Sequence, residues 1–320
     1  MKWFIVELFV SVRIVRKKIC KYARVVLYYG KQHEGRDIML KKAYVEITNA
    51  CNLSCSFCHG TKRAIRYMTT KEFRHICAEL QGKVEFLYFH VMGEPLLHPR
   101  LEEFLAIAEE NGFQVILTTN GTLLKKTADI LCASGNIRKI SISLHSYEAN
   151  TAGYTLEEYL TDCFAFCKRA AEQGIICVMR LWNQGGAENL NPEILEQMHS
   201  FFDSGENTEW KTSYSGYKIK DRIFLEWGQY FDWPDLEGEY RGNTHTCYAL
   251  RDQLGILSDG TVVPCCLDAE GSIPLGNVFI TPISEILASP RAVQMKKALE
   301  NRRITEPLCQ RCGYAHMKKY

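Results

Sequence analysis

The sequence lacks several features that would place the protein in a specialised class. Its apolar stretch at residues 3–10 is too short to span a bilayer and is soon followed by Arg13. A signal peptide also fits poorly, because the positive charge follows that stretch and no small-residue cleavage site appears. Low-complexity segments, solenoid repeats and an aromatic-basic platform for nucleic acid are missing as well. We therefore expect a globular, cytoplasmic protein that binds no nucleic acid.

A large net charge is also missing, since the formal value is +2, but the charge is unevenly distributed. Residues 1–42 hold eleven Lys or Arg and three Asp or Glu, a net +8. On a helical wheel the basic residues gather opposite the apolar ones, which predicts an amphipathic helix. Its basic side consists of Arg13, Arg16, Lys17, Lys21 and Arg24. Such an arm either lies on an anionic membrane surface, which would make the protein peripheral there, or packs against the main domain.

Cysteine, in contrast, is abundant, with 14 residues in a chain of 320. A cytoplasmic chain of this length has core enough without disulfides, so metal ligation and free thiols explain the cysteines better. Seven of them stand at spacings typical of ligands: Cys51, Cys55, Cys58, Cys247, Cys265, Cys309 and Cys312. We expect most of the others to be buried as apolar packing.

From about residue 43 the pattern alternates between strand and helix, which predicts a parallel sheet with helices outside it. The predicted strands are 43–48, 84–89, 113–119, 137–144, 175–181 and 223–227. The predicted helices are 69–81, 98–111, 122–134, 155–173 and 191–203. Eight such units close a TIM barrel, so six predict an α/β fold with an open, partial (β/α)6 TIM-like barrel. The loops at the carboxyl ends of its strands should carry the chemistry.

The loop after the first predicted strand carries three cysteines in the spacing Cys51-x-x-x-Cys55-x-x-Cys58. Three thiolates on one short loop can bind three irons of a 4Fe-4S cluster and leave the fourth iron open to an external ligand. The alternative is a structural zinc site with His59 as the fourth ligand.

This motif resembles the signature of the radical S-adenosylmethionine (radical SAM) enzymes, in which an aromatic residue precedes the last cysteine, as Phe57 does here. The resemblance implies that the open iron binds SAM and that the reduced cluster cleaves it to a 5'-deoxyadenosyl radical, which takes hydrogen from a substrate. It also implies an electron donor of the flavodoxin or ferredoxin type and the same open barrel.

Two further strand ends resemble the SAM site of this family. The segment Met92-Gly93-Glu94-Pro95 resembles the family's Gly-Gly-Glu-Pro edge, with Met92 in place of the first glycine, and it implies a contact with the SAM amino group. The third strand ends in a Thr-Thr-Asn-Gly-Thr segment that is also found near SAM in the family. The cofactor-binding residues expected in this way are Phe57, Gly93, Glu94, Pro95, Asn120 and Ser143.

Strands four to six offer three candidate catalytic residues. Alternation along strand four places Ser141, Ser143 and His145 on the barrel's inner side, where His145 either reaches substrate or serves as a hydrogen-bonded structural residue. Arg180 and Glu226 are charged residues within apolar strands, which are costly unless paired or functional. They either pair with each other across strands, or Arg180 binds the SAM carboxylate.

The chain changes character after residue 230. Residues 254–265 read as a β-hairpin with an Asp-Gly turn at Asp259 and Gly260. Together with Cys247 and a terminal Cys309-x-x-Cys312, this layout resembles the auxiliary-cluster modules of radical SAM enzymes, the SPASM domain and its shorter twitch relative. The resemblance implies one auxiliary 4Fe-4S cluster on Cys247, Cys265, Cys309 and Cys312, with Cys266 facing away, although a four-cysteine zinc site has similar spacing.

The sequence thus predicts three parts: an arm at 1–42, a radical SAM barrel at 43–230 and an auxiliary-cluster module at 231–320. The resulting functional prediction is a radical SAM oxidoreductase with two 4Fe-4S clusters that oxidises a C–H or carbinol centre of a small-molecule or peptide substrate. Maturation of a ribosomally made peptide is the first alternative, and cyclisation of GTP is another. A non-catalytic iron-sulfur scaffold or electron carrier is the alternative from a different class.

Overall fold

The computed structural model describes residues 40–150, 153–203 and 209–317. The predicted amphipathic helix of the arm and Cys20 lie outside these residues, so the membrane-surface and packing alternatives stay predictions. The last three residues of the predicted arm, 40–42, are part of the first strand instead. The described residues form one compact unit. In the part of the chain that the structure describes, no helix has the length and apolar character needed to cross a membrane.

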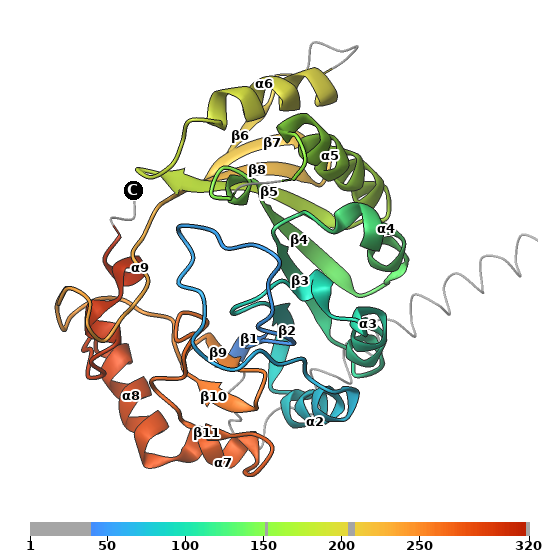
Figure 1. The fold of residues 1–320 in the computed structure, drawn as a ribbon. Helices are drawn as coiled ribbons and strands as arrows, with labels where there is room; N and C mark the ends of the chain where they lie inside the picture. Colours follow the sequence, from blue (N-terminus) through green and yellow to red (C-terminus); the bar gives the residue numbers. More distant parts are fainter. Residues whose placement is uncertain (1–39, 151–152, 204–208, 318–320) are drawn as a thin grey trace, which may run out of the picture. The chain divides into compact units, whose positions relative to one another are not determined.

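The unit is built on one sheet of eleven strands in the order β11-β10-β9-β1-β2-β3-β4-β5-β8-β7-β6. The strands are β1 (Leu40–Val45), β2 (Val84–Phe89), β3 (Gln114–Thr119), β4 (Ile137–Ser143), β5 (Ile176–Gln184), β6 (Lys211–Ser213), β7 (Gly216–Lys220), β8 (Ile223–Gln229), β9 (Gln253–Ile256), β10 (Thr261–Val263) and β11 (Gly276–Asn277). The six predicted strands, β1 to β5 and β8, run parallel as neighbours. The sheet curves without closing (Figure 1), so the predicted open barrel is confirmed.

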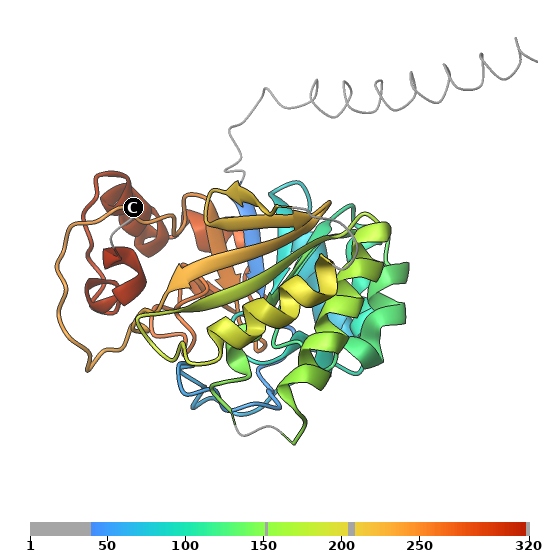
Figure 2. The ribbon, with the colours of Figure 1, turned by 90° about the horizontal axis from the view of Figure 1, so that it is seen from above.

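Helices cover the outer face of the curved sheet, as Figures 1 and 2 both show. They are α2 (Thr70–Leu80), α3 (Leu101–Glu110), α4 (Leu124–Ala133), α5 (Leu156–Glu172) and α6 (Asn191–Phe202). Two of them begin at capping boxes, which satisfy backbone N–H groups that the first helical turn leaves unpaired. Thr69 pairs with Glu72 at the start of α2, and Thr155 pairs with Glu158 at the start of α5. The main core lies between these helices and the sheet.

The sheet is larger than the sequence predicts, at both edges. The predicted hairpin is present as β9 and β10, but β9 pairs in parallel with β1 and so extends the same sheet. At the other edge, β6 and β7 form an antiparallel hairpin against β8 that the sequence analysis missed. The proposed division at residue 230 stays a prediction, because strands on both sides of it share one sheet.

Three helices follow the hairpin. They are α7 (Ile283–Ala288), α8 (Pro290–Glu300) and α9 (Gly313–His316), with a 3-10 turn at Cys309–Arg311 between the last two. Short 3-10 turns also lie beside two of the predicted elements. Pro95–Leu97 precedes α3, which begins three residues later than predicted, and Leu144–Ser146 follows β4, so His145 lies just beyond the strand.

Candidate active site

The three cysteines of the first motif lie together on the loop that follows β1. The thiols of Cys51 and Cys58 belong to exposed residues and Cys55 is half-buried. The backbone N–H of Cys58 donates to the carbonyl oxygen of Cys55 at 3.0 Å, which closes a turn between these two residues. The amide of Asn150 donates to Sγ of Cys55 at 3.0 Å. Three thiols on one short, turned loop suit a cluster with three cysteine ligands.

The chemistry of these thiols agrees with that reading. Partial burial of the sulfur atoms raises the pKa of all three thiols. The pKa of Cys55 is raised to about 11, because the nearby Cys58 and Cys51 add to the effect of burial. Mutual repulsion of this kind requires the sulfur atoms to be close, and iron would favour their thiolate forms. In the described ranges, no three Cys, His, Asp or Glu side chains already stand in a metal-holding arrangement.

Gly93, at the end of β2, lets the backbone of the next loop approach the cysteine loop closely. Its φ is +78°, and an added Cβ would lie 2.6 Å from the carbonyl oxygen of Thr48 and 2.7 Å from that of Ala50. The neighbouring N–H of Glu94 donates to the carbonyl of Ala50 at 2.7 Å. Only glycine combines this left-handed backbone with so close a contact.

Replacing Gly93 by Ala is therefore expected to cost about 2–5 kcal/mol of unfolding free energy, from backbone strain and overpacking together. Gly82 is the matched control, because its φ is +73° but nothing lies within 4 Å of an added Cβ. Gly82→Ala should show only the strain, about 1–2 kcal/mol. Urea unfolding of both variants checks this, and equal losses would show that the close approach at Gly93 has no energetic weight.

Glu94 connects the ends of β2 and β3. Its carboxylate accepts hydrogen bonds from the N–H of Leu96 at 3.0 Å, the hydroxyl of Thr119 at 2.8 Å and the N–H of Asn120 at 2.7 Å. Burial raises the pKa of Glu94 to about 7, and these three hydrogen bonds oppose that rise. Pro95 starts the following 3-10 turn. The carboxylate thus holds the predicted SAM edge in place, and its role toward SAM itself stays a prediction.

Asn120 ties the end of β3 back to the cysteine loop. Its amide donates to Oδ1 of Asn52 at 3.0 Å, and its own oxygen accepts from the hydroxyl of Thr122 at 2.7 Å. Asn52 in turn donates to that hydroxyl at 2.8 Å. The sequence analysis missed Asn52, although its place between two predicted ligands was a usable signal. The predicted cofactor segments after β1, β2 and β3 therefore meet at one edge of the sheet.

The aromatic residue of the cysteine motif contacts the end of β4. The ring of Phe57 lies 4.8 Å from the ring of His145, centroid to centroid. Nδ1 of His145 is 3.0 Å from the carbonyl oxygen of Arg180, to which it donates when that nitrogen carries the proton. Burial, aided by the charge of Arg180, lowers the pKa of His145 to about 4. Ser143 stands opposite Arg180 in the β4–β5 pairing.

A small cavity of about 110 Å³ lies beside this contact. It is lined by Ser56, Phe57, His145, Ala149, Trp182, Asn183, Ala187 and Tyr230. His145 is thus a candidate both for substrate contact and for loop support, because it lines the cavity and also makes a structural hydrogen bond.

Arg180 and Glu226 form the cross-strand pair that the sequence left as one of two alternatives. Nε of Arg180 lies 3.1 Å from Oε2 of Glu226, and the two residues are direct neighbours in the β5–β8 pairing. The hydroxyl of Ser215 donates to the other oxygen of Glu226 at 3.2 Å. The guanidinium also lies over the ring of Trp182, 4.3 Å from its centroid.

A second buried ion pair links the cysteine loop to the C-terminal segment, and the sequence analysis missed it. Glu46 is fully buried, and its carboxylate accepts hydrogen bonds from both terminal nitrogens of Arg63, at 2.8 and 2.7 Å. It also accepts from the N–H of Ser258 at 3.1 Å, while Nε of Arg63 donates to the carbonyl of Ala269 at 2.9 Å. A glutamate inside the predicted first strand, 43–48, was the available signal, although the observed β1 ends at Val45.

The four C-terminal cysteines also neighbour one another. Burial raises the pKa of Cys265, Cys309 and Cys312, and the charge of a Cys247 thiolate would raise each of them further. The thiol of Cys266 instead contacts the hydroxyl of Tyr44 and packs in a separate cluster. Four thiols in mutual range suit a fully cysteine-ligated cluster, and the assignment of each ligand stays a prediction.

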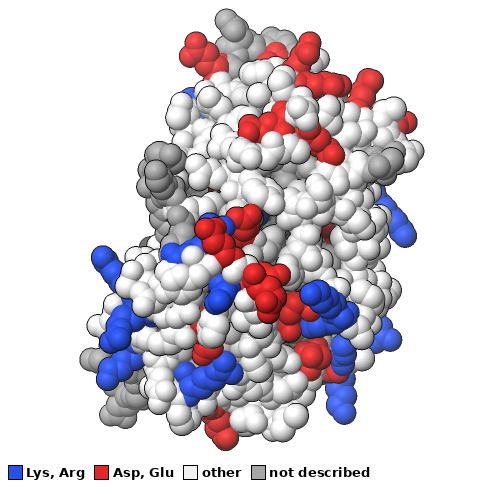
Figure 3. Space-filling view, turned by 60° about the vertical axis from the view of Figure 1, so that its left-hand side comes forward, with Lys and Arg blue, Asp and Glu red and all other residues white. Residues whose placement is uncertain are grey.

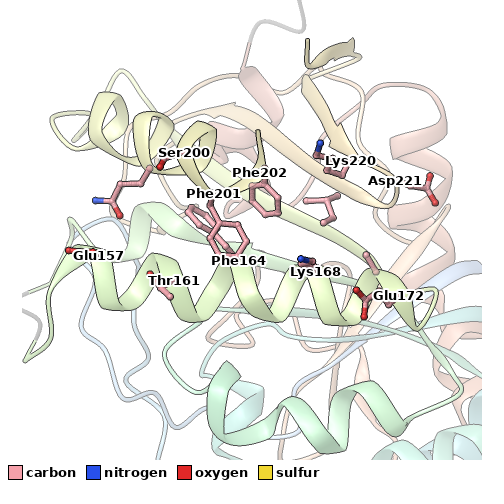
Figure 4. A pocket seen from close by; sticks show the side chains of 13 residues that line it. Glu157, Thr161, Phe164, Lys168, Glu172, Ser200, Phe201, Phe202, Lys220 and Asp221 are labelled. Atoms are coloured by element: carbon pink, nitrogen blue, oxygen red, sulfur yellow. The ribbon is translucent and has the colours of Figure 1, made fainter. Parts of the chain in front are cut away.

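A larger cavity, of about 1080 Å³, lies elsewhere, between α5, α6 and the β7–β8 turn on the outer side of the sheet (Figure 4). Its lining mixes the rings of Phe164, Phe201 and Phe202 with charged residues such as Lys168 and Glu172. None of the predicted site residues lines it, so size alone does not identify the active site here.

Comparison with protein families agrees with this geometry. Residues 45–188 match the radical SAM superfamily, and residues 247–313 match an iron-sulfur cluster-binding domain. Among curated relatives, a probable GTP 3',8-cyclase of Pyrobaculum aerophilum is 30% identical over 110 residues, which are 33% of this chain and 35% of the relative. An AdoMet-dependent heme synthase of Methanosarcina barkeri is 29% identical over 33% of this chain and 31% of its own length. The chain thus spans about a third of these relatives.

One curated relative is covered more fully, and solved structures match over most of the chain. The GTP 3',8-cyclase of Microcystis aeruginosa is 25% identical over 75% of this chain and 85% of the relative. BtrN in complex with AdoMet and 2-DOIA matches with a TM-score of 0.57 at 17% identity, over 86% of this chain and 94% of BtrN. Streptococcus suis SuiB bound to precursor peptide SuiA also matches with a TM-score of 0.57, at 18% identity, over 92% of this chain and 74% of SuiB. These structures share the fold.

Proposed function

Because the chain belongs to the radical SAM superfamily and carries an iron-sulfur cluster-binding domain, we propose that it is an oxidoreductase with two 4Fe-4S clusters. When bound, SAM and the first cluster would supply a 5'-deoxyadenosyl radical that takes a hydrogen atom from a C–H or carbinol centre. The substrate then loses a proton and a second electron, which completes a two-electron oxidation. The second electron would go to the cluster held by the C-terminal cysteines.

The convergence of three strand ends carries the proposal that SAM is bound here. Cys51, Cys55 and Cys58 offer three thiolates, so one iron of their cluster would be left without a protein ligand. Glu94 holds the edge beside it through three hydrogen bonds to the ends of β2 and β3. The chain's own part is therefore to position an open iron next to a fixed polar edge.

Ligand number supports oxidation over the alternatives. Cys247, Cys265, Cys309 and Cys312, as the proposed ligands of the second cluster, would saturate a 4Fe-4S cluster, so no iron there could bind substrate. A cluster without an open iron is suited to accepting an electron. A peptide substrate remains the second candidate, since the solved SuiB and anSMEcpe complexes with this fold contain peptides.

Iron content tests the two-cluster proposal directly. Anaerobic reconstitution of the full chain should give about eight irons per chain, four for each cluster. Cys265→Ala should lower this to about four, whereas Cys266→Ala, the adjacent control, should leave about eight. Four irons in the unmodified protein, or zinc at the C-terminal cysteines, would contradict the proposal.

The proposed function includes two partners, an electron donor and an anionic membrane surface. An electron donor of the flavodoxin or ferredoxin type is proposed because reduction of the first cluster requires one. The net +8 of residues 1–42 supports attachment to an anionic membrane surface, which would weaken as salt rises. Co-sedimentation with anionic vesicles, compared with a chain starting at residue 38, would measure it, and equal retention of both would contradict it.

A further inference from the structure

The inner face of the sheet is the concave side that the covering helices leave free, and strand alternation identifies its residues. On β1, Ala43 and Val45 belong to the main core under the helices, whereas Tyr44 packs in a second cluster. Lys42 stands two positions before Tyr44 and its amine lies over the ring of Tyr44, so Lys42 faces inward as well. Met179 and Leu181, on either side of Arg180 in β5, belong to the main core, which places Arg180 on the inner face. In β4, Lys139 and Ser141 alternate with the core residues Ile140 and Ile142, which places Lys139 there too.

Few carboxylates lie near these three cations on the inner face. Arg180 is paired with Glu226, but within the described residues neither Lys42 nor Lys139 has a carboxylate within 4.0 Å. Nζ of Lys42 lies instead over two tyrosine rings, 5.2 and 5.1 Å from the centroids of Tyr44 and Tyr88. On the outer surface, by contrast, Figure 3 shows acidic as well as basic groups on one face.

The electrostatic neighbours of the lysines agree with this arrangement. Burial lowers the pKa of Lys42 and of Lys139, and each is lowered further by Arg180. Acidic groups act in the opposite direction, Cys266 and Asp252 on the pKa of Lys42 and Glu226 on that of Lys139. The protein therefore keeps two half-buried amines beside other cations, an arrangement that costs stability unless an anion completes it.

The same face also holds buried polar atoms without hydrogen-bond partners in the described structure. They are Nδ1 of His90, Oγ1 of Thr118, Oγ of Ser141 and Nε1 of Trp182. Thr118 and Ser141 are direct neighbours in the β3–β4 pairing, and Ser141 stands two positions beyond Lys139. Unpaired buried polar groups are rare in folded proteins, and four on one face indicate a missing polar ligand.

We propose that the inner face binds a substrate carrying an anionic group, a phosphate or a carboxylate, which lies between Lys42 and Lys139 while the polar part of the substrate contacts Thr118 and Ser141. This inference rests on the proposed function, because it assigns a substrate class to the same barrel. The carboxylate of SAM is not the anion in question. Lys139 stands four residues, or about 13 Å of strand, before the end of β4, whereas SAM belongs at the cysteine loop beyond the strand ends.

Calorimetric titration of the full, cluster-loaded chain in the presence of SAM tests the proposal. The probes are inorganic pyrophosphate and citrate, with uncharged myo-inositol as the reference. Both anions should bind, and Lys42→Met with Lys139→Met should weaken their binding about tenfold or more, as expected for lost charged hydrogen bonds. The control double variant is Lys41→Met with Arg138→Met, since both residues are exposed on the same strands and the charge change is equal. It should change the binding less than twofold.

Thermal unfolding of the same variants separates binding from a structural role. Because the inward lysines have no close acidic partner, the Lys42→Met, Lys139→Met protein should melt at or above the temperature of the unmodified protein, and Lys→Arg at both sites should restore anion binding. A lowered melting temperature, equal loss in the exposed control, or tighter binding of myo-inositol than of the anions would overturn the proposal. Formation of 5'-deoxyadenosine by the unmodified chain tests the proposed function separately, because it needs no substrate anion.

Discussion

Replacing Cys51, Cys55 and Cys58 together by Ala is expected to reduce 5'-deoxyadenosine formation from SAM to the level seen without protein. Dithionite-driven cleavage requires an iron that can bind SAM, and without three thiolates on this loop no such cluster can be held. Chromatographic measurement of 5'-deoxyadenosine after anaerobic reconstitution checks the result. Two of the three residues are exposed, so their truncation leaves the main core intact.

The triple variant carries its own internal control. The C-terminal cysteines remain, so about four irons per chain should still be bound after reconstitution, which shows that the protein is folded and loadable. Cys77→Ala is the matched control for cysteine loss as such, because Cys77 is buried in α2, away from both cysteine sets. It should leave SAM cleavage intact. Continued 5'-deoxyadenosine formation by the triple variant would show that the first motif does not hold the catalytic cluster.

The parallel strands and their helices could be predicted because each has a local signal. β2, for example, is an apolar run whose observed bounds, Val84–Phe89, equal the predicted ones, and α2 begins at a capping box that is visible in the sequence. Of the missed strands, β11 has only two residues, and β6 and β7 are short and polar. β7 pairs with β8, and β6 pairs with β7. Such strands depend on a neighbouring edge, and their own sequence shows no clear alternation.

The candidate site divides in the same way. The cysteines and the Gly-Glu-Pro segment are visible as motifs because their chemistry requires fixed residue types at fixed spacing. The contact of Glu46 with Ser258 spans 212 positions, and no pattern in either segment predicts it. It exists because β9 pairs with β1, which brings the turn after β9 next to the cysteine loop. Long-range pairing therefore determines how the two cysteine sets are connected, and the sequence alone shows only that both exist.

That connection bears on the inner cations as well. Alternation predicted inward positions for Ser141 and Ser143. The structure adds that Lys42, from a strand about 100 residues earlier, acts on the pKa of the same histidine, His90, as Lys139 does. Both lysines lower the pKa of His90, together with Arg180, in addition to burial. Charges from β1, β4 and β5 converge only when the sheet curves, so a linear reading treats each lysine as an ordinary strand residue.

Replacing Cys309 and Cys312 by Ala is expected to leave SAM cleavage largely intact while conversion of substrate to oxidised product falls below detection. The radical site depends on the first three cysteines, whereas the two-electron oxidation needs an acceptor for the second electron. Electron paramagnetic resonance of the reduced variant should show one cluster signal in place of two. The ratio of 5'-deoxyadenosine to oxidised product, near one when the reaction is coupled, should rise steeply.

Folding must be separated from electron transfer in this variant, because Cys312 is buried and Leu308 belongs to the main core. Circular dichroism and thermal unfolding establish whether the C-terminal segment remains ordered, and Cys266→Ala provides the control for a lost thiol next to the site. The observed links of this segment to the barrel, such as the hydrogen bond from the N–H of Ser258 to Glu46 and the β1–β9 pairing, do not involve Cys309 or Cys312 and should hold it in place. A folded variant that still oxidises substrate at the normal rate would leave the second cluster with a structural role alone. A cluster with four cysteine ligands cannot bind substrate, and such a result would show that it is not needed as the electron acceptor either.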